Sequence, residues 1–202
     1  MMVVVVGAAG RTGAAVAQAA LAQGHAVRGV GARRGVDPQV VWFEGDTEDP
    51  AVLAAAFAGA DAVVCAIGPT ARHPHGAGAA TAAILAAMRR LDVPRLVVVT
   101  GAMVGAPTQK LSWLYRMIRA VPSVAVEIED RRTQESLVCA SDRLWTILRP
   151  ARLTDDPAGS PRVGEDLPVG LFAHTARMDL AAVAVPSLGD PALCDRAHTV
   201  LS

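Results

Sequence analysis

The chain has 202 residues, of which 52% are apolar and only 3% aromatic, so it can bury a sizeable core of small aliphatic side chains. Its 19 basic and 19 acidic side chains give a formal net charge of zero. This balance argues against a nucleic-acid-binding protein, because phosphate backbones require a concentrated positive surface. No stretch reaches the ~20 consecutive strongly apolar residues that a membrane span needs.

The start of the chain and its cysteines are typical of a cytoplasmic protein. The N-terminus leads directly into an apolar run and a glycine-rich loop, without the basic segment and cleavage site of a secretory signal. Cys65, Cys139 and Cys194 are far apart and odd in number, which indicates neither a disulfide framework nor a metal cluster. We therefore expect a soluble monomer or homodimer with a single domain over 1–202 and no metal, membrane or nucleic-acid partner.

Short β-branched runs alternate with Ala-rich segments of helical composition. Strands are predicted over 3–6, 26–30, 39–43, 61–67, 95–100, 144–148 and 198–201. Helices are predicted over 12–23, 49–58, 77–91, 126–140 and 178–187. Asp46 or Thr47 is expected to cap the second of these helices, and Arg149 with Pro150 is expected to stop the sixth strand.

This alternation predicts an α/β fold, a single doubly wound (Rossmann) parallel sheet with helices on both faces. Ligands of such folds bind at the carboxyl ends of the strands, so functional residues are expected directly after each strand. Two segments interrupted by Gly and Pro, near 101–123 and 154–171, would form lids over these ends.

The strongest signal is the glycine loop Gly-Ala-Ala-Gly-Arg-Thr-Gly at 7–13, which joins the first strand to the first helix. Its glycines let the backbone turn tightly and approach a ligand, while the following helix N-terminus attracts a pyrophosphate. The alternative is that the glycines serve only a tight turn. The predicted cofactor-binding residues here are Gly7, Ala9, Gly10, Arg11, Thr12 and Gly13.

The end of the second strand indicates which dinucleotide binds. An NAD site usually has an Asp or Glu there, whereas this chain has Arg33 and Arg34 and no acid before Asp37. Two guanidinium groups, with Arg11 nearby, can hold a 2′-phosphate, so NADP is the predicted cofactor. NAD remains an alternative. The alternative is a pair of solvated turn arginines. Asp46 is placed to contact the adenine edge.

Several motifs together resemble the atypical short-chain dehydrogenase/reductase family, including its biliverdin reductase B (flavin reductase-like) and NmrA-like groups. The motifs lie at 7–13, 24–28 (GHAVR), 45–46 (GD), 61–68 (DAVVCAIG), 145–150 (WTILRP) and 176–181 (ARMDLA). The resemblance runs nearly end to end and implies an NAD(P)-binding bacterial protein. It also implies which residues surround the nicotinamide: Ile67, Gly68, Pro69, Thr100, Gly101, Pro150 and Ala151.

The side chains that donate protons in this family are not found where the resemblance places them. The Tyr and Lys of the wider superfamily fall at Glu127 and Arg131, while the Ser and His of the flavin reductase type fall at Gly101 and Ala151. The catalytic candidates are therefore Tyr115, whose alternative is plain packing, and Glu127 with Arg131 as an acid/base pair. For that pair the alternative is an i,i+4 surface ion pair.

The candidates for substrate binding follow the fourth and sixth strands. Arg72, His73 and Arg152 could orient an anionic or carbonyl-bearing small molecule. His73 and His75 would need a third ligand to hold a metal, and none is apparent, so a solvent-facing loop histidine is the alternative.

Three hypotheses for function follow. The first is an NADP-dependent oxidoreductase that transfers hydride to a flavin, quinone or other conjugated carbonyl small molecule, with solvent supplying the proton. The second is a non-redox NADP(H) sensor of the NmrA-like kind, suggested by the missing proton donors. The third is an isomerase, cyclase or dehydratase that retains the cofactor and acts on a bacterial secondary metabolite.

Overall fold

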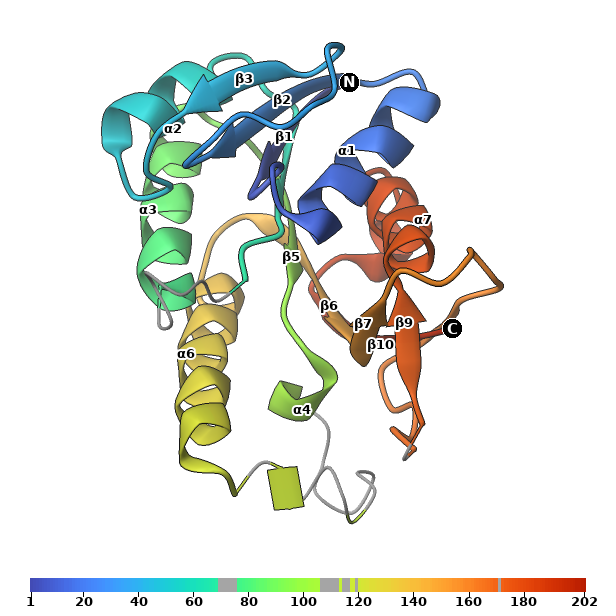
Figure 1. The fold of residues 1–202 in the computed structure, drawn as a ribbon. Coiled ribbons are helices and arrows are strands. Elements are labelled where there is room, and N and C mark those ends of the chain that lie inside the picture. Colours follow the sequence, from blue (N-terminus) through green and yellow to red (C-terminus); the bar gives the residue numbers. More distant parts are fainter. Residues whose placement is uncertain (69–75, 106–112, 114–116, 119, 171) are drawn as a thin grey trace.

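The computed structural model describes residues 1–68, 76–105, 113, 117–118, 120–170 and 172–202. Within these ranges the main sheet has the strand order β3-β2-β1-β4-β5-β6-β10-β8, and every neighbouring pair is parallel except β10 with β8 (Figure 1). The predicted α/β Rossmann fold is therefore confirmed. The strands are β1 (Met2–Val6), β2 (Ala26–Gly31), β3 (Val41–Glu44), β4 (Ala62–Cys65), β5 (Arg95–Val99), β6 (Leu144–Pro150), β8 (Arg162–Gly164) and β10 (Arg196–Leu201).

Helices cover both faces of the sheet. Helices α1 (Arg11–Ala22) and α7 (Arg177–Ser187) lie side by side on one face, seen on the right in Figure 1. The other face carries α2 (Pro50–Phe57), α3 (Ala77–Arg90) and α6 (Pro122–Cys139). A short helix, α4 (Ala102–Gly105), follows β5, and a 3₁₀ turn, η2 (Pro191–Leu193), precedes β10.

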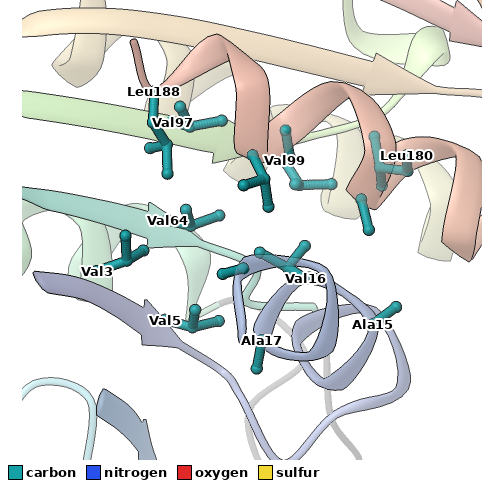
Figure 2. Close-up of a cluster of buried hydrophobic side chains, with 14 of the residues drawn as sticks. Val3, Val5, Ala15, Val16, Ala17, Val64, Val97, Val99, Leu180 and Leu188 are labelled. Carbon is teal, nitrogen blue, oxygen red and sulfur yellow. The ribbon is translucent and has the colours of Figure 1, made fainter. Parts of the chain in front are cut away.

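The strand side chains form a core on each face. Successive residues of a strand point to opposite faces, so Val3 and Val5 pack against α1 and α7, whereas Val4 and Val6 pack toward α2 and α3. Figure 2 shows the first of these cores, where small side chains of α1 such as Val16 meet the strands. All four valines are fully buried, which explains the unbroken apolar run in the sequence.

Several predicted element ends differ from the structure, and two of these differences have a clear physical reason. Strand β6 continues through Pro150 instead of ending at Leu148. This is tolerated because β5 has already ended: Val99 pairs with Leu148, and Pro150 pairs only with Val200 of β10, so the missing N–H leaves no gap. Helix α6 begins at Pro122 rather than at residue 126, because proline suits the first helical turn.

The cap of α2 also differs from the prediction. Asp49 is the N-cap residue, and its carboxylate accepts a hydrogen bond from the amide N–H of Ala51 at 2.8 Å. Asp46 instead accepts from the amide of Glu48 at 3.0 Å and so shapes the turn after β3.

The region predicted as irregular after β6 contains three short strands. Besides β8, it includes β7 (Arg152–Thr154), which pairs in parallel with β9 (His174–Ala176) to form a separate two-stranded sheet. Three-residue strands are too short to show a hydrophobic alternation, which is why the sequence did not reveal them. In Figure 1 this small sheet lies below α7, which directly follows β9.

Candidate functional site

The glycine loop closes tightly on itself at the carboxyl end of β1. The amide of Gly10 donates to the carbonyl of Gly7 at 3.0 Å, and Gly7 has a φ of +86°. A Cβ added to Gly7 would lie 2.8 Å from the carbonyl oxygen of Ala66, and one on Gly13 would lie 2.7 Å from the carbonyl carbon of Gly7. Only glycine fits these two positions, since the first needs the left-handed region and the second touches backbone.

The first turn of α1 is open to an anion. Gly10 precedes the helix and has no side chain to cap it, and no acidic residue lies in the first turn. The unpaired N–H groups and the positive end of the helix dipole therefore face the glycine loop, and no carboxylate of the first turn of α1 competes for them. This arrangement can accommodate a pyrophosphate, and the role predicted for the loop stays a prediction.

The three arginines predicted to read a 2′-phosphate border one cavity of about 590 Å³. Arg11 comes from the start of α1, whereas Arg33 and Arg34 come from the loop after β2. Arg34 forms an ion pair with Glu44, with 3.6 Å between Nε and Oε2. Arg33 has no ion-pair partner within the described ranges. Further residues line the cavity: Ala8, Ala9, Ala14, Ala15, Ala17, Gln18, Gly35, Val36, Asp37, Val40, Trp42, Asp155, Asp156, Arg177 and Met178.

The residues expected around a nicotinamide gather at the ends of β4, β5 and β6. Ile67 and Gly68 follow β4, and Thr100 and Gly101 follow β5, where the Thr100 amide donates to the carbonyl of Leu148 at 2.9 Å. Pro150 ends β6, and the amide of Ala151 donates to the Thr175 hydroxyl at 3.0 Å. Pro69 lies outside the described residues.

A buried polar network that the sequence reasoning missed lies beneath this edge. Thr100 donates its hydroxyl proton to Oε1 of Glu135 at 2.7 Å. Arg149 donates to both carboxylate oxygens, from Nε at 3.0 Å and from Nη2 at 2.6 Å. Because Thr100 has a single hydroxyl proton and Glu135 accepts it, the hydroxyl can offer only lone pairs to a ligand. The sequence feature that could have suggested this network is an acidic residue, Glu135, on the predicted helix just before the strand that carries Arg149.

Arg131 is buried and cross-links the ends of two strands. Its Nη1 donates to the carbonyls of Ile67 at 2.8 Å and Val99 at 3.3 Å, and to Oε1 of Gln134 at 2.9 Å. These acceptors are all neutral, and within the described part of the chain Arg131 forms no ion pair. The surface pair with Glu127 is therefore not observed. Burial lowers the pKa of Arg131 from its ordinary value, because desolvation penalises the charged guanidinium.

Gly68 lies close to the buried guanidinium of Arg131. Among the described residues, Arg131 Nη2 is the one atom that a Cβ on Gly68 would approach within contact distance, at 3.9 Å. Glu127 is half-buried one turn earlier on α6, and Arg152 is exposed on β7. The candidates Tyr115, Arg72 and His73 lie outside the described residues.

Comparison with known proteins identifies the relatives of this fold. A Burkholderia pseudomallei protein has a TM-score of 0.83 and 26% identity, with 100% of both chains covered. ChuY, an anaerobillin reductase from Escherichia coli O157:H7, has a TM-score of 0.80 and 23% identity over 99% of this chain and 96% of its own. A Veillonella parvula short-chain dehydrogenase/reductase in complex with NADP has a TM-score of 0.81 and 18% identity over 98% and 93%.

The predicted NAD(P)-binding character is confirmed by a family model, and the fold is shared with solved structures of short-chain dehydrogenase/reductases. A search of curated protein sequences gives no match. None of the helices in the described ranges is long and apolar enough to cross a membrane. Residues 7–191 match the family model described as NAD(P)H-binding. Since this match spans most of the chain, the protein belongs to the NAD(P)H-binding family.

Proposed function

We propose that the protein is an NADP-dependent oxidoreductase that delivers hydride to a flavin, a quinone or another conjugated carbonyl small molecule. The observation that carries the proposal is the cavity beside the glycine loop that Arg11, Arg33 and Arg34 line together. Three guanidinium groups next to an uncapped helix N-terminus suit the 2′-phosphate and pyrophosphate of NADP. NAD, which lacks the 2′-phosphate, would use fewer of these groups.

The described strand ends offer a site for hydride transfer that does not require a side-chain acid. Bound NADPH supplies the hydride. The small residues Gly68, Gly101 and Ala151 leave room for a flat ring, and the buried Arg131 contributes a positive charge next to Gly68. A guanidinium stays protonated, so Arg131 would stabilise negative charge on a reduced acceptor rather than serve in an acid/base pair with Glu127.

The proton in this proposal comes from solvent. Flavins, quinones and conjugated carbonyls form stabilised anions on hydride addition, so they need no positioned acid at the moment of transfer. Thr100 suits the role of hydrogen-bond acceptor for a ligand, because Glu135 takes its only hydroxyl proton. Tyr115 stays a predicted proton donor, and Arg72, His73 and Arg152 stay predicted substrate contacts.

Acceptor-dependent oxidation of NADPH tests the reaction. We expect purified protein to oxidise NADPH with at least one of FMN, FAD, a naphthoquinone or an enone, and to move deuterium from one face of 4-deuterated NADPH. Arg131→Met should lower the turnover rate roughly 100- to 1,000-fold, since removing one donor at developing negative charge typically costs about that much. NADPH binding without turnover for any acceptor would contradict hydride transfer and favour the NmrA-like sensor.

Cofactor affinities test the arginine site separately. Arg33→Ala with Arg34→Ala should weaken NADPH binding roughly 10- to 100-fold and NADH binding less than about threefold, because charge-assisted hydrogen bonds to the phosphate are lost. The control is Arg89→Ala with Arg90→Ala, which removes the same charge at the far end of α3. An equal loss for the two cofactors would show that Arg33 and Arg34 do not read the 2′-phosphate.

The domain organisation and location belong to the same proposal. A single domain over 1–202 is supported by a sheet whose strands run from Met2 to Leu201. Much of the lid predicted near 101–123 lies outside the described residues, and the lid near 154–171 stays a prediction. A monomer or homodimer stays a prediction. So does a cytoplasmic location, since the Burkholderia relative carries the name of an exported protein.

A further inference from the structure

A single carboxylate bridges two arginines at the mouth of the arginine-lined cavity. Asp155 Oδ2 accepts from Nη1 of Arg11 at 3.0 Å, and its Oδ1 accepts from Nη1 of Arg177 at 2.5 Å. Arg11 begins α1 and Arg177 begins α7, whereas Asp155 directly follows β7. The bridge therefore joins the glycine loop to the segment after the sixth strand, 144 residues away along the chain.

The two halves of this bridge differ in burial. The Arg177 side chain is only 10% exposed, and its buried Nε has no hydrogen-bond partner within the described residues. The Arg11 side chain is 74% exposed. Arg177 needs the carboxylate to balance a desolvated charge, while Arg11 can leave it at little cost. Asp155 is thus anchored on the Arg177 side and exchangeable on the Arg11 side.

Asp155 stays ionised in this setting. Desolvation raises the pKa of its carboxyl, but the hydrogen bond and positive charge of Arg177, and then the charge of Arg11, outweigh that effect and hold the pKa below its ordinary value. A phosphate entering the cavity would therefore meet a permanent negative charge that already occupies Arg11.

We propose that Asp155 is a cofactor-specificity residue that competes with the 2′-phosphate for Arg11 and so reduces the preference for NADPH over NADH. This inference rests on the proposed function. Arg11, Asp155 and the two loop arginines line the same cavity, so a bound phosphate and the carboxylate are alternative partners of one exposed guanidinium. NADH carries a hydroxyl at that position and does not enter the competition.

The neighbouring Asp156 provides a matched control. It lines the same cavity and carries the same charge, but its partner is His174, with 3.9 Å between Oδ2 and Nε2. Asp156→Asn therefore removes one negative charge from the cavity without freeing Arg11. A change in affinity that both asparagine variants share reports the loss of one negative charge from the cavity. The difference between the two variants reports the competition for Arg11.

Dissociation constants for NADPH and NADH, measured by fluorescence titration, test the proposal. We expect Asp155→Asn to tighten NADPH binding about three- to tenfold and to change NADH binding less than about twofold, as freeing one surface ion pair allows. Asp156→Asn should change both affinities less than about twofold. In an Arg11→Ala background Asp155→Asn should lose its effect, because the shared partner is gone.

Folding and function are checked with the same proteins. Asn keeps an acceptor for Arg177, thermal unfolding verifies each variant, and Asp155→Ser is the second variant if Asp155→Asn is unstable. The inference alone is overturned if the wild-type protein prefers NADPH and Asp155→Asn or Asp155→Ser leaves that preference unchanged or lowers it. It is also overturned if Asp155→Asn tightens NADPH binding as much in the Arg11→Ala background as in the wild-type protein. If the wild-type protein binds NADPH and NADH equally and the Arg33→Ala/Arg34→Ala variant changes neither affinity, the proposed function is overturned as well.

Discussion

Gly13→Ala is expected to lower the stability of the protein strongly. The added Cβ would overlap the carbonyl oxygen of Gly7 and lie 2.7 Å from the Gly7 carbonyl carbon and 2.8 Å from Ala8 Cα. These neighbours are backbone atoms within the loop, so they cannot yield as a flexible side chain would. We expect a loss of about 3 kcal/mol in the free energy of unfolding, measured in urea, since overpacking of this kind costs roughly that much.

Gly10→Ala is the matched control for that result. Among the described residues, a Cβ there would meet only the Gly7 carbonyl oxygen, at 3.2 Å, and the residue has a φ of −80°, which alanine adopts readily. Stability should change by less than about 1 kcal/mol. Binding of NADPH should nevertheless weaken about tenfold, because the methyl group would face the incoming pyrophosphate. Equal stability of Gly13→Ala and Gly10→Ala would contradict the described loop geometry.

Glu135→Ala is expected to destabilise the protein by about 3 kcal/mol in the same measurement. Glu135 is 11% and Arg149 18% exposed at the side chain, so the substitution leaves a largely desolvated guanidinium and the Thr100 hydroxyl without their acceptor. Arg149 cannot easily turn to solvent, because it packs against Gly105, where a Cβ would overlap its guanidinium.

Glu129→Ala serves as the control on the same helix. Glu129 pairs with Arg132 at 3.3 Å, but the two side chains are 69% and 48% exposed, so the loss should stay below about 0.5 kcal/mol. If Glu135→Ala and Glu129→Ala cost the same, the Thr100–Glu135–Arg149 network does not contribute the predicted stability. A Glu135→Leu/Arg149→Met protein should recover part of the loss, since no unpaired charge remains buried.

Much of the fold was predictable because its signals are local. The valine run of β1 is buried on both faces, and the glycine spacing at 7–13 follows from turns that tolerate only small residues. The strands β7, β8 and β9 were not predictable, because three residues show no period and their pairing partners lie far along the chain. The prediction that β6 ends before Pro150 was wrong, because a proline destabilises a strand only where a neighbouring strand continues and would accept a hydrogen bond from its missing N–H.

The candidate site divides in the same way. The sequence by itself determined the α/β architecture, the position of the glycine loop and the presence of basic residues after β2, because each depends on residues close together in the chain. Only the tertiary structure decided that Arg131 points into the protein toward strand-end carbonyls, that Glu135 joins Thr100 to Arg149, and that Asp155 bridges Arg11 and Arg177. Such contacts join remote segments. Their partners depend on how helices pack against the sheet, which no local pattern of residues encodes.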